Sequence, residues 1–244
     1  MRTRYPLGRK ESPPDARDWN LIDHIPASAK LGEQEPVNVN WPFPGDTLNQ
    51  DQTNHCVGFS MADYLINLPI NTPCTNKDGH DFYYACKVLD GEPGNEDGSY
   101  VRSAAKALKN MGRINAYAFA PNITTLRWWL INKGPLIMGT AWTEGMFTPD
   151  AENIIHPYGN IVGGHAYIID ELKDGNLYGI QNSWGAYWGV NGKAYISESD
   201  LSFIFADGGE ALSAVELSAT MEKKPASILE IIIQFILSLF SKEK

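Results

Sequence analysis

The hydrophobic periodicity of this 244-residue chain changes once, near residue 135, and that change limits the folds that the chain can adopt. Between residues 54 and 134, apolar side chains recur at every third or fourth position, as they do along the buried face of a helix. Beyond residue 135 they form short runs separated by turn residues, which is typical of strands. A helical half followed by a strand half predicts an α+β fold with two lobes, and functional sites often lie where two such lobes meet.

Caps, breakers and turns predict the individual elements. Asn54, Ser99 and Thr124 are expected to cap helices, and Pro69 and Gly112 to end two of them. We therefore expect helices at 54–68, 81–89, 99–111 and 124–134, strands at 135–142, 165–170, 176–181, 193–197 and 214–217, and a turn at 173–175.

These elements divide the chain into five predicted segments. We expect an irregular segment that wraps the core at 1–49, a helical lobe at 50–134, a β lobe at 135–217, a linker at 218–226 and an amphipathic hydrophobic tail at 227–244. The apolar part of the tail, 227–240, has polar residues at a helical spacing, and at about 1.5 Å per residue it reaches roughly 21 Å, short of the roughly 30 Å core of a bilayer. Two interpretations stay open: this helix lies on a membrane or partner surface, or it packs on the chain's own domain.

Charge and cysteine content exclude several classes of protein. Twenty Lys and Arg against 29 Asp and Glu give a net charge of −9, so no basic surplus is available to neutralise phosphates and we expect no nucleic-acid partner. Three cysteines cannot all pair, which excludes a disulfide scaffold. No apolar stretch follows the basic residues near the N-terminus, so we expect no secretory signal. The expected location is the cytoplasm or another reducing compartment, with membrane association only through the tail.

Cys56, His165 and Asn182 form the candidate catalytic group. Cys56 falls at the start of a predicted helix, where the partial positive charge of the helix N-terminus lowers a thiol pKa and favours the nucleophilic thiolate. His165 begins an apolar strand and Asn182 ends its neighbour, so a hairpin between them brings the two residues together. An Asn side chain that accepts the ring N–H holds an imidazole in the orientation that a base requires. Trp184 is expected to shield this hydrogen bond from water.

Two motifs that contain these residues resemble those of the papain-like cysteine peptidases. Gln50, five further residues and Cys56-Val57-Gly58-Phe59-Ser60 are similar to the family's Gln, five residues, Cys-Trp-Ala-Phe-Ser. Asn182-Ser183-Trp184-Gly185, with Trp188-Gly189 and Asn191-Gly192 after it, is similar to a second family segment almost residue for residue. The resemblance covers roughly residues 37–217 and is to compact, disulfide-free members such as prokaryotic or viral forms. It implies a helical N-terminal lobe and an antiparallel β C-terminal lobe with the active site between them.

The resemblance also implies an activity, the endopeptidase hydrolysis of polypeptides through an acyl-enzyme, with no cofactor and no metal. Cys56 would be the nucleophile and His165 its proton partner, the two resting as a thiolate–imidazolium pair, with Asn182 orienting the ring. The side-chain amide of Gln50 and the backbone N–H of Cys56 would form the oxyanion hole. Substrate contacts are implied for four further residues: Gly98, Gly163, Gly164 and Trp184.

The chain departs from the family pattern in several places. His165 lies 109 residues after Cys56, whereas about 130–150 is usual, so roughly twenty residues of loop are missing upstream of it. Val57 stands where the family has Trp, and Thr53 where it has a disulfide-bonded Cys. No long charged helix of an inhibitory pro-segment precedes Cys56, which leaves control of activity to another element or to an N-terminal segment that covers the cleft.

Three alternatives compete with the peptidase. A catalytically silent papain-fold interaction or structural protein stays open, as does a Cys–His cell-wall amidase or endopeptidase. A zinc site built from His55, His80, Cys74 or Cys86 lacks the usual ligand spacings, so no metal site is predicted and His55 is expected to face solvent.

Overall fold

The computed structural model describes residues 5–26 and 37–215. The predicted linker at 218–226 and tail at 227–244 lie outside the described residues, and the predicted segment boundaries stay predictions. No helix within the described ranges is both long and apolar enough to cross a membrane.

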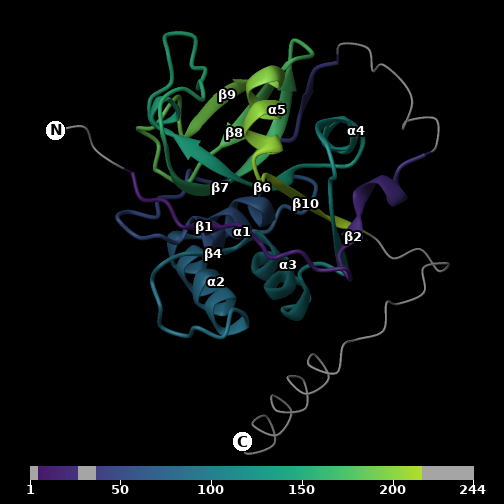
Figure 1. Cartoon of the computed structure of the whole chain (residues 1–244), viewed down its shortest axis with the longest axis vertical. Coiled ribbons are helices and arrows are strands. Elements are labelled where there is room, and N and C mark those ends of the chain that lie inside the picture. The colour runs from purple at the N-terminus through teal and green to yellow at the C-terminus, as the bar shows by residue number, and fades with distance from the viewer. Residues whose placement is uncertain (1–4, 27–36, 216–244) are drawn as a thin grey trace, which may run out of the picture.

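Three helices form a helical lobe, which lies below the sheet in Figure 1. Every residue of α1 (Cys56–Ile66) is buried, because α2 (Asn76–Leu89), α3 (Val101–Asn110) and the sheet pack around it. A helix that is enclosed on all sides must be largely apolar around its whole circumference, which explains the sequence of α1. α3 is amphipathic and buries only one face.

A second group of elements is built on one twisted sheet. Its strands follow the order β2-β5-β10-β6-β7-β8-β9, with β3 added beside β7. All pairings are antiparallel except that of β2 with β5. The strands are β2 (Trp19–Asn20), β3 (Val39–Asn40), β5 (Ala116–Phe119), β6 (Leu136–Thr143), β7 (Ile161–Lys173), β8 (Leu177–Gln181), β9 (Lys193–Ser197) and β10 (Glu210–Val215).

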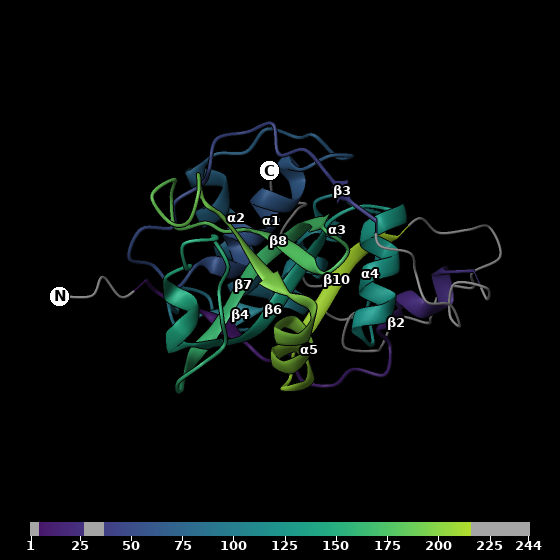
Figure 2. The ribbon, with the colours of Figure 1, turned by 90° about the horizontal axis from the view of Figure 1, so that it is seen from above.

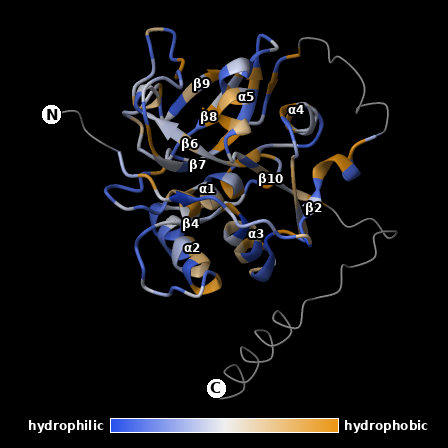
Figure 3. Cartoon of the chain, in the orientation of Figure 1, coloured by the Kyte–Doolittle hydropathy of each residue, from blue (hydrophilic) through white to orange (hydrophobic). Residues whose placement is uncertain are grey.

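The centre of the sheet is covered on both faces. Alternate side chains of a strand point to opposite faces. Leu136 and Met138 of β6 therefore pack in one core with α4 (Ile123–Asn132) and α5 (Glu198–Ala206), whereas Ile137 packs in another core with α1 and α3. Figures 1 and 2 show these helices on the two sides of the central strands, and in Figure 3 the hydrophobic residues gather where the helices meet the sheet. The predicted α+β class is confirmed.

An N-terminal segment crosses between the helical lobe and the sheet. Its strand β1 (Arg9–Lys10) pairs in parallel with β4 (Ser99–Tyr100), which directly precedes α3. In Figure 1 this purple stretch passes in front of α1, between β4 on one side and β7 on the other. We call residues 5–12 the covering segment.

The helix starts differ from the prediction because other side chains provide the caps. Asn54 does not cap α1, since its side chain donates to the carbonyl of Glu96. α2 begins at Asn76 rather than at 81, because Thr75 and Asp78 form a capping box there. Asn122 rather than Thr124 caps α4.

Strand and helix assignments near the sheet also needed correction. Ser99 belongs to β4 instead of capping α3. β7 begins at Ile161, so the Gly163-Gly164 pair lies inside a strand. The sequence also missed β5 and α5, the latter capped by the side chain of Ser197. The turn at 173–175 is confirmed, with Asp174 and Gly175 both at positive φ.

Candidate active site

Cys56 is the first residue of α1 and lies where that helix meets β7 and the covering segment. Its side chain is fully buried. Backbone N–H groups of Ala166, Gly8 and Val57 are hydrogen-bonded to its sulfur. Ala166 follows His165 on β7, so this contact places the strand that carries His165 beside the thiol.

His165 and Asn182 are joined as the sequence predicted. The Nε2–H of His165 donates to Oδ1 of Asn182 at 2.9 Å, and the same oxygen accepts from the backbone N–H of Ser183 at 2.8 Å. Two donors on one oxygen fix which end of the amide faces the ring. With its proton on Nε2, His165 presents the lone pair of Nδ1, and this atom has no hydrogen-bond partner among residues 5–26 and 37–215. The arrangement leaves a base directed away from Asn182.

Gln50 is also held in place. It is fully buried, its backbone N–H donates to the carbonyl of Ser183 at 2.9 Å, and its Oε1 accepts from the Ser183 hydroxyl at 3.0 Å. The amide nitrogen Nε2 is thereby turned the other way, where it donates to the carbonyl of Thr53 at 2.7 Å and reaches that of Pro6 in the covering segment at 3.5 Å. A donor in this position faces the site rather than the core.

Aromatic rings enclose the imidazole. Trp184 stacks on His165 with ring centroids 4.4 Å apart, and Trp142 meets it edge-on at 4.9 Å. Tyr5 of the covering segment stacks in turn on Trp184, with centroids 4.6 Å apart and planes 6° from parallel. Trp184 therefore lies over His165 and its bond to Asn182, as predicted, and the covering segment adds a further ring outside it.

Gly98 forms the opposite edge of the site. Its φ is +100°, and a Cβ atom here would lie 2.1 Å from the carbonyl oxygen of Gly8. Both facts require glycine. The carbonyl of Gly98 accepts from Lys87, a fully buried lysine whose ammonium also binds Glu92 and Asp97. This network holds the edge in a fixed position.

The covering segment occupies the space between these edges. The carbonyl of Gly8 accepts from the N–H of Ser99 at 2.8 Å, and a Cβ at Gly8 would lie 1.9 Å from the carbonyl of Asn54. On the β7 side, Leu7 lies against Gly163 and the backbone of Arg9 against Gly164, so both glycines make room for the segment. The residues expected to contact substrate are therefore covered by the chain's own N-terminal segment.

Burial reverses the predicted protonation of the pair. Desolvation raises the pKa of the Cys56 thiol to about 11 despite the three backbone N–H groups and the nearby Arg9 charge, all of which favour the thiolate. Desolvation likewise lowers the pKa of His165 to about 4, against the opposing effect of the Asn182 bond. We call the structure in which residues 5–12 cover the site the closed form. The predicted resting thiolate–imidazolium pair is wrong for this form, in which thiol and imidazole are both neutral at pH 7.

His55, expected to face solvent, is buried instead. Its Nδ1 lies 2.8 Å from Nδ1 of His80, its Nε2 contacts the Glu96 carboxylate, and its ring stacks on Tyr83 at 3.7 Å. Among residues 5–26 and 37–215, no set of three or more His, Cys, Asp or Glu side chains is arranged to hold a metal ion. Cys56, Cys74 and Cys86 are all free thiols.

The sequence left open an N-terminal segment that covers the cleft, but it did not identify the contacts that hold this segment in place. Arg9 and Glu210, joined at 2.6 Å, are 201 positions apart, and no local pattern connects residues so distant. The signal available was a cluster of basic residues, Arg2, Arg4, Arg9 and Lys10, at the start of an acidic chain.

Neither a protein-family model nor a curated protein sequence matches the chain, but solved structures do. Xylellain, a cysteine protease from Xylella fastidiosa, matches with a TM-score of 0.66 and 16% identity, covering 88% of this chain and 100% of its own. proCathepsin B S9 from Trypanosoma congolense matches with 0.64 and 12%, covering 88% and 87%. The digestive procathepsin L 3 of Tenebrio molitor larval midgut matches with 0.54 and 13%, covering 79% and 73%. The likeness confirms the fold expected from the motifs: the chain has a papain-like fold.

Proposed function

We propose that the chain is a cysteine peptidase that hydrolyses peptide bonds through Cys56 and His165. The observation that carries the proposal is the orientation of His165. Its Nε2–H is bound to Asn182, so Nδ1 is the proton acceptor, and the next residue along the strand donates its backbone N–H to the Cys56 sulfur.

The proposed reaction begins when Nδ1 of His165 takes the proton of Cys56. The thiolate attacks the carbonyl carbon of the substrate, and the oxyanion accepts hydrogen bonds from Nε2 of Gln50 and the N–H of Cys56. His165 then gives its proton to the departing amine, which leaves an acyl-enzyme. Water, deprotonated by His165, attacks the thioester and releases the acid, and the proton returns to the thiolate.

The closed form does not carry out this reaction on its own covering segment. Gly8 presents its backbone N–H to the sulfur, which favours the thiolate. In a trans peptide the carbonyl of Leu7 points to the side opposite that N–H, away from the sulfur. The carbonyl of Gly8 is bound to Ser99. We therefore propose that residues 5–12 hold the peptidase inactive until they are displaced.

The test compares four proteins. They are the unaltered protein, the Arg9→Ala variant, which removes one anchor of the covering segment, and two double variants. One double variant combines Arg9→Ala with Cys56→Ala, and the other, the matched control, combines it with Cys74→Ala. Each is incubated with a fluorogenic peptide library and with denatured protein. We expect Arg9→Ala to hydrolyse peptides faster than the unaltered protein. The double variant with Cys56→Ala should be inactive, and the one with Cys74→Ala should be as active as Arg9→Ala alone.

Three outcomes would count against the proposal. Activity retained without the Cys56 sulfur would remove the nucleophile from the mechanism. No hydrolysis by any variant, with the fold intact by circular dichroism, would favour a catalytically silent protein of this fold. Release of peptidoglycan fragments without peptide hydrolysis would instead favour the cell-wall enzyme.

A further inference from the structure

His55, the residue before the nucleophile, is bound at both ring nitrogens and on one face. Its side chain is only 2% exposed and makes no capping hydrogen bond to α1, so its contacts serve other elements. Nε2 contacts the carboxylate of Glu96, Nδ1 lies 2.8 Å from Nδ1 of His80, and the ring stacks on Tyr83 with planes 13° from parallel. We call His55, His80 and Glu96 the His55 cluster.

The protons of this cluster can be assigned from its charges. Burial lowers the pKa of His55 against the opposing effect of Glu96, so the ring is neutral at pH 7 and carries one proton. The hydrogen bond from His55 lowers the pKa of Glu96, so this carboxylate is ionised and only accepts. The proton of His55 is therefore on Nε2, and Nδ1 accepts from the Nδ1–H of His80. Both donations run toward Glu96, which fixes the tautomer and the orientation of the His55 ring.

The cluster joins the two helices that meet beside the nucleophile. His55 directly precedes α1, and His80 belongs to α2. The two helices touch at this point, because a Cβ atom on Gly58 would lie 2.3 Å from the carbonyl oxygen of Gly79. The packing of two helices, rather than a loop, therefore sets the position of His80 relative to Cys56.

Glu96 connects the cluster to the Gly98 edge. It lies two residues before Gly98, and its carbonyl accepts from the side chain of Asn54 at 3.1 Å. Tyr83, on which the His55 ring stacks, accepts from the N–H of Gly98 at 3.1 Å through its hydroxyl. The Gly98 edge is thus bound to the residue that begins the nucleophile's helix.

The Gly98 edge binds an extended backbone in this structure. β4 follows it directly and pairs in parallel with β1 of the covering segment, and the N–H of Ser99 donates to the carbonyl of Gly8 at 2.8 Å. A peptide substrate that replaces the segment can pair with the same N–H. Binding costs less when such an edge is already in place than when it must first become ordered.

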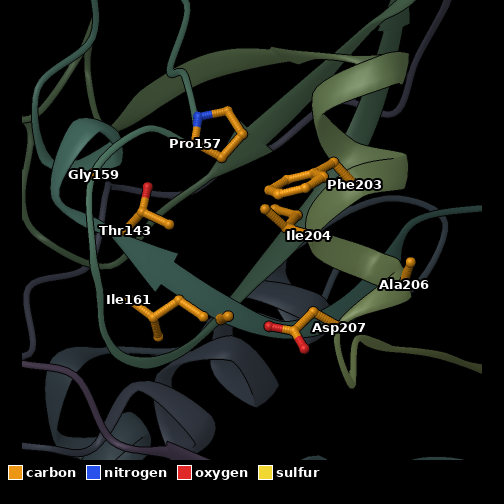
Figure 4. A pocket seen from close by; sticks show the side chains of 9 residues that line it. Thr143, Pro157, Gly159, Ile161, Phe203, Ile204, Ala206 and Asp207 are labelled. Carbon is orange, nitrogen blue, oxygen red and sulfur yellow. The ribbon is translucent and has the colours of Figure 1, made fainter.

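Asp207 offers a comparison on the other side of the covering segment. It follows α5 and lines an apolar pocket of about 520 Å³, into which Figure 4 shows Phe203 and Ile204 projecting. Asp207 is exposed and directly precedes Gly208, whose carbonyl accepts from Arg9. Asp207→Ala therefore removes a negative charge close to the covering segment without altering the His55 cluster.

We propose that the His55 cluster holds the Gly98 edge in position relative to Cys56, so that a peptide backbone binds there without first ordering the edge. Where it concerns substrate, this inference rests on the proposed function. The three residues of the cluster are positioning residues, because none of them takes part in the proposed proton transfer between Cys56 and His165. The cluster should therefore act on KM rather than on kcat, and it should favour binding of the covering segment in the same way.

The first experiment measures the covering segment and needs no catalysis. Glu96→Ala removes the acceptor of His55, Glu96→Gln retains an acceptor without the charge, and Asp207→Ala is the matched control. The Glu96 side chain is 55% exposed, so its replacement leaves the core intact. Each protein is treated with iodoacetamide, and mass spectrometry follows alkylation of Cys56 and of Cys86, a buried thiol that reports loosening of the helical lobe.

We expect Cys56 to be alkylated about tenfold faster in Glu96→Ala than in the unaltered protein, as the loss of a hydrogen bond to a charged group implies. Glu96→Gln should lie between the two, and Asp207→Ala should differ from the unaltered protein by less than about twofold. The Cys86 rate should not change.

The second experiment measures turnover of fluorogenic peptides in the Arg9→Ala background. His55→Phe keeps a flat ring against Tyr83 but loses both nitrogens, whereas His55→Gln restores a donor near the position of Nε2. We expect His55→Phe to raise KM about tenfold with little change in kcat, and His55→Gln to recover part of this loss. Adding Glu96→Ala to His55→Phe should have no further effect, because both changes remove the same bond.

Several outcomes would overturn the inference. They are an unchanged Cys56 rate in Glu96→Ala, an equal rise in Asp207→Ala or at Cys86, a fall in kcat without a rise in KM, and additive effects of the His55 and Glu96 changes. If His55→Phe fails to fold, the Glu96 variants decide the question in both experiments. Faster alkylation of Cys56 in Glu96→Ala without hydrolysis by any variant would retain the role of the cluster and contradict only the proposed peptidase activity.

Discussion

Acid should displace the covering segment from Cys56, because His165 can bind a proton only by losing its burial. In the closed form the ring lies under Trp184, which Tyr5 covers in turn, and it has no charged partner within the site. Departure of residues 5–12 admits water to the ring and removes the desolvation that opposes protonation. Proton binding and opening are therefore linked.

The magnitude follows from the two proton affinities of His165. Its pKa is about 4 in the closed form, and we take the ordinary value of about 6.5 for the open form. His165 has the lower pKa in the closed form, so its neutral ring favours the closed form over the open form. This contribution is fully present above pH 6.5 and is lost as the pH falls toward 4. At pH 5 the open form is almost fully protonated at this ring and the closed form almost fully neutral, which favours opening by about thirtyfold, or about 2 kcal/mol.

Opening can be measured through the reactivity of Cys56. The reagent 2,2′-dipyridyl disulfide reacts with thiols in acid, and when closing is faster than the reaction the rate is proportional to the open population. Half-buried Cys74 reports the intrinsic pH dependence of the reagent in the same sample. The ratio of the Cys56 rate to the Cys74 rate, determined by peptide mapping, should rise about thirtyfold between pH 8 and pH 5.

The expected rise comes from the His165 ring alone, so His165→Asn should abolish it while leaving the Cys74 rate unchanged. A flat ratio between pH 8 and 5 in the unaltered protein would show that His165 does not resist protonation in the closed form. The same rise in His165→Asn would show that another group governs opening.

Two further predictions concern stability and turnover. Asp63 is fully buried with neither carboxylate oxygen hydrogen-bonded, and burial together with the nearby Asp170 charge raises its pKa well above the usual value. The folded state thus binds a proton that the unfolded chain releases above about pH 4. The urea midpoint of the unaltered protein, measured relative to that of Asp63→Asn, should fall as the pH rises from 4 to 8, because every other titrating group is common to both proteins. A difference that did not change with pH would contradict this origin. Asn182→Ala releases the His165 ring, so kcat in the Arg9→Ala background should fall by about tenfold or more with little change in KM; an unchanged kcat would show that Asn182 does not position the base.

Motifs with local spacing predicted the arrangement of His165, Asn182 and Trp184 in the candidate site. The hairpin that joins His165 to Asn182 follows from alternation and a turn, both of which extend over less than 20 residues. The stacking of Trp184 on His165 follows because Trp184 is two residues beyond Asn182. In such segments the periodicity of the sequence determines which side chains lie next to one another in the site.

Protonation and covering of the site could not be predicted in the same way. A helix N-terminus lowers the pKa of a thiol by a local interaction, but desolvation depends on every atom around Cys56, and here it is the larger effect. The covering segment contains no helix and pairs through only two residues of β1, so it leaves no periodic signal in the sequence. Its position depends on contacts with Ser99, Gly164 and Glu210, which lie from about 90 to 200 residues further along the chain.

The covering segment couples three charges that the closed form avoids or neutralises. While residues 5–12 are in place, Cys56 and His165 are both neutral and Glu210 is paired with Arg9. When they leave, water reaches the imidazole, which becomes able to bind a proton, and the carboxylate loses its Arg9 partner. Protons and substrate peptides both bind the open form better, so they act on one equilibrium and each should strengthen the effect of the other. A site closed in this way would open most readily where acid and substrate occur together, because neither a protonated His165 nor a substrate peptide can be accommodated while the segment is bound.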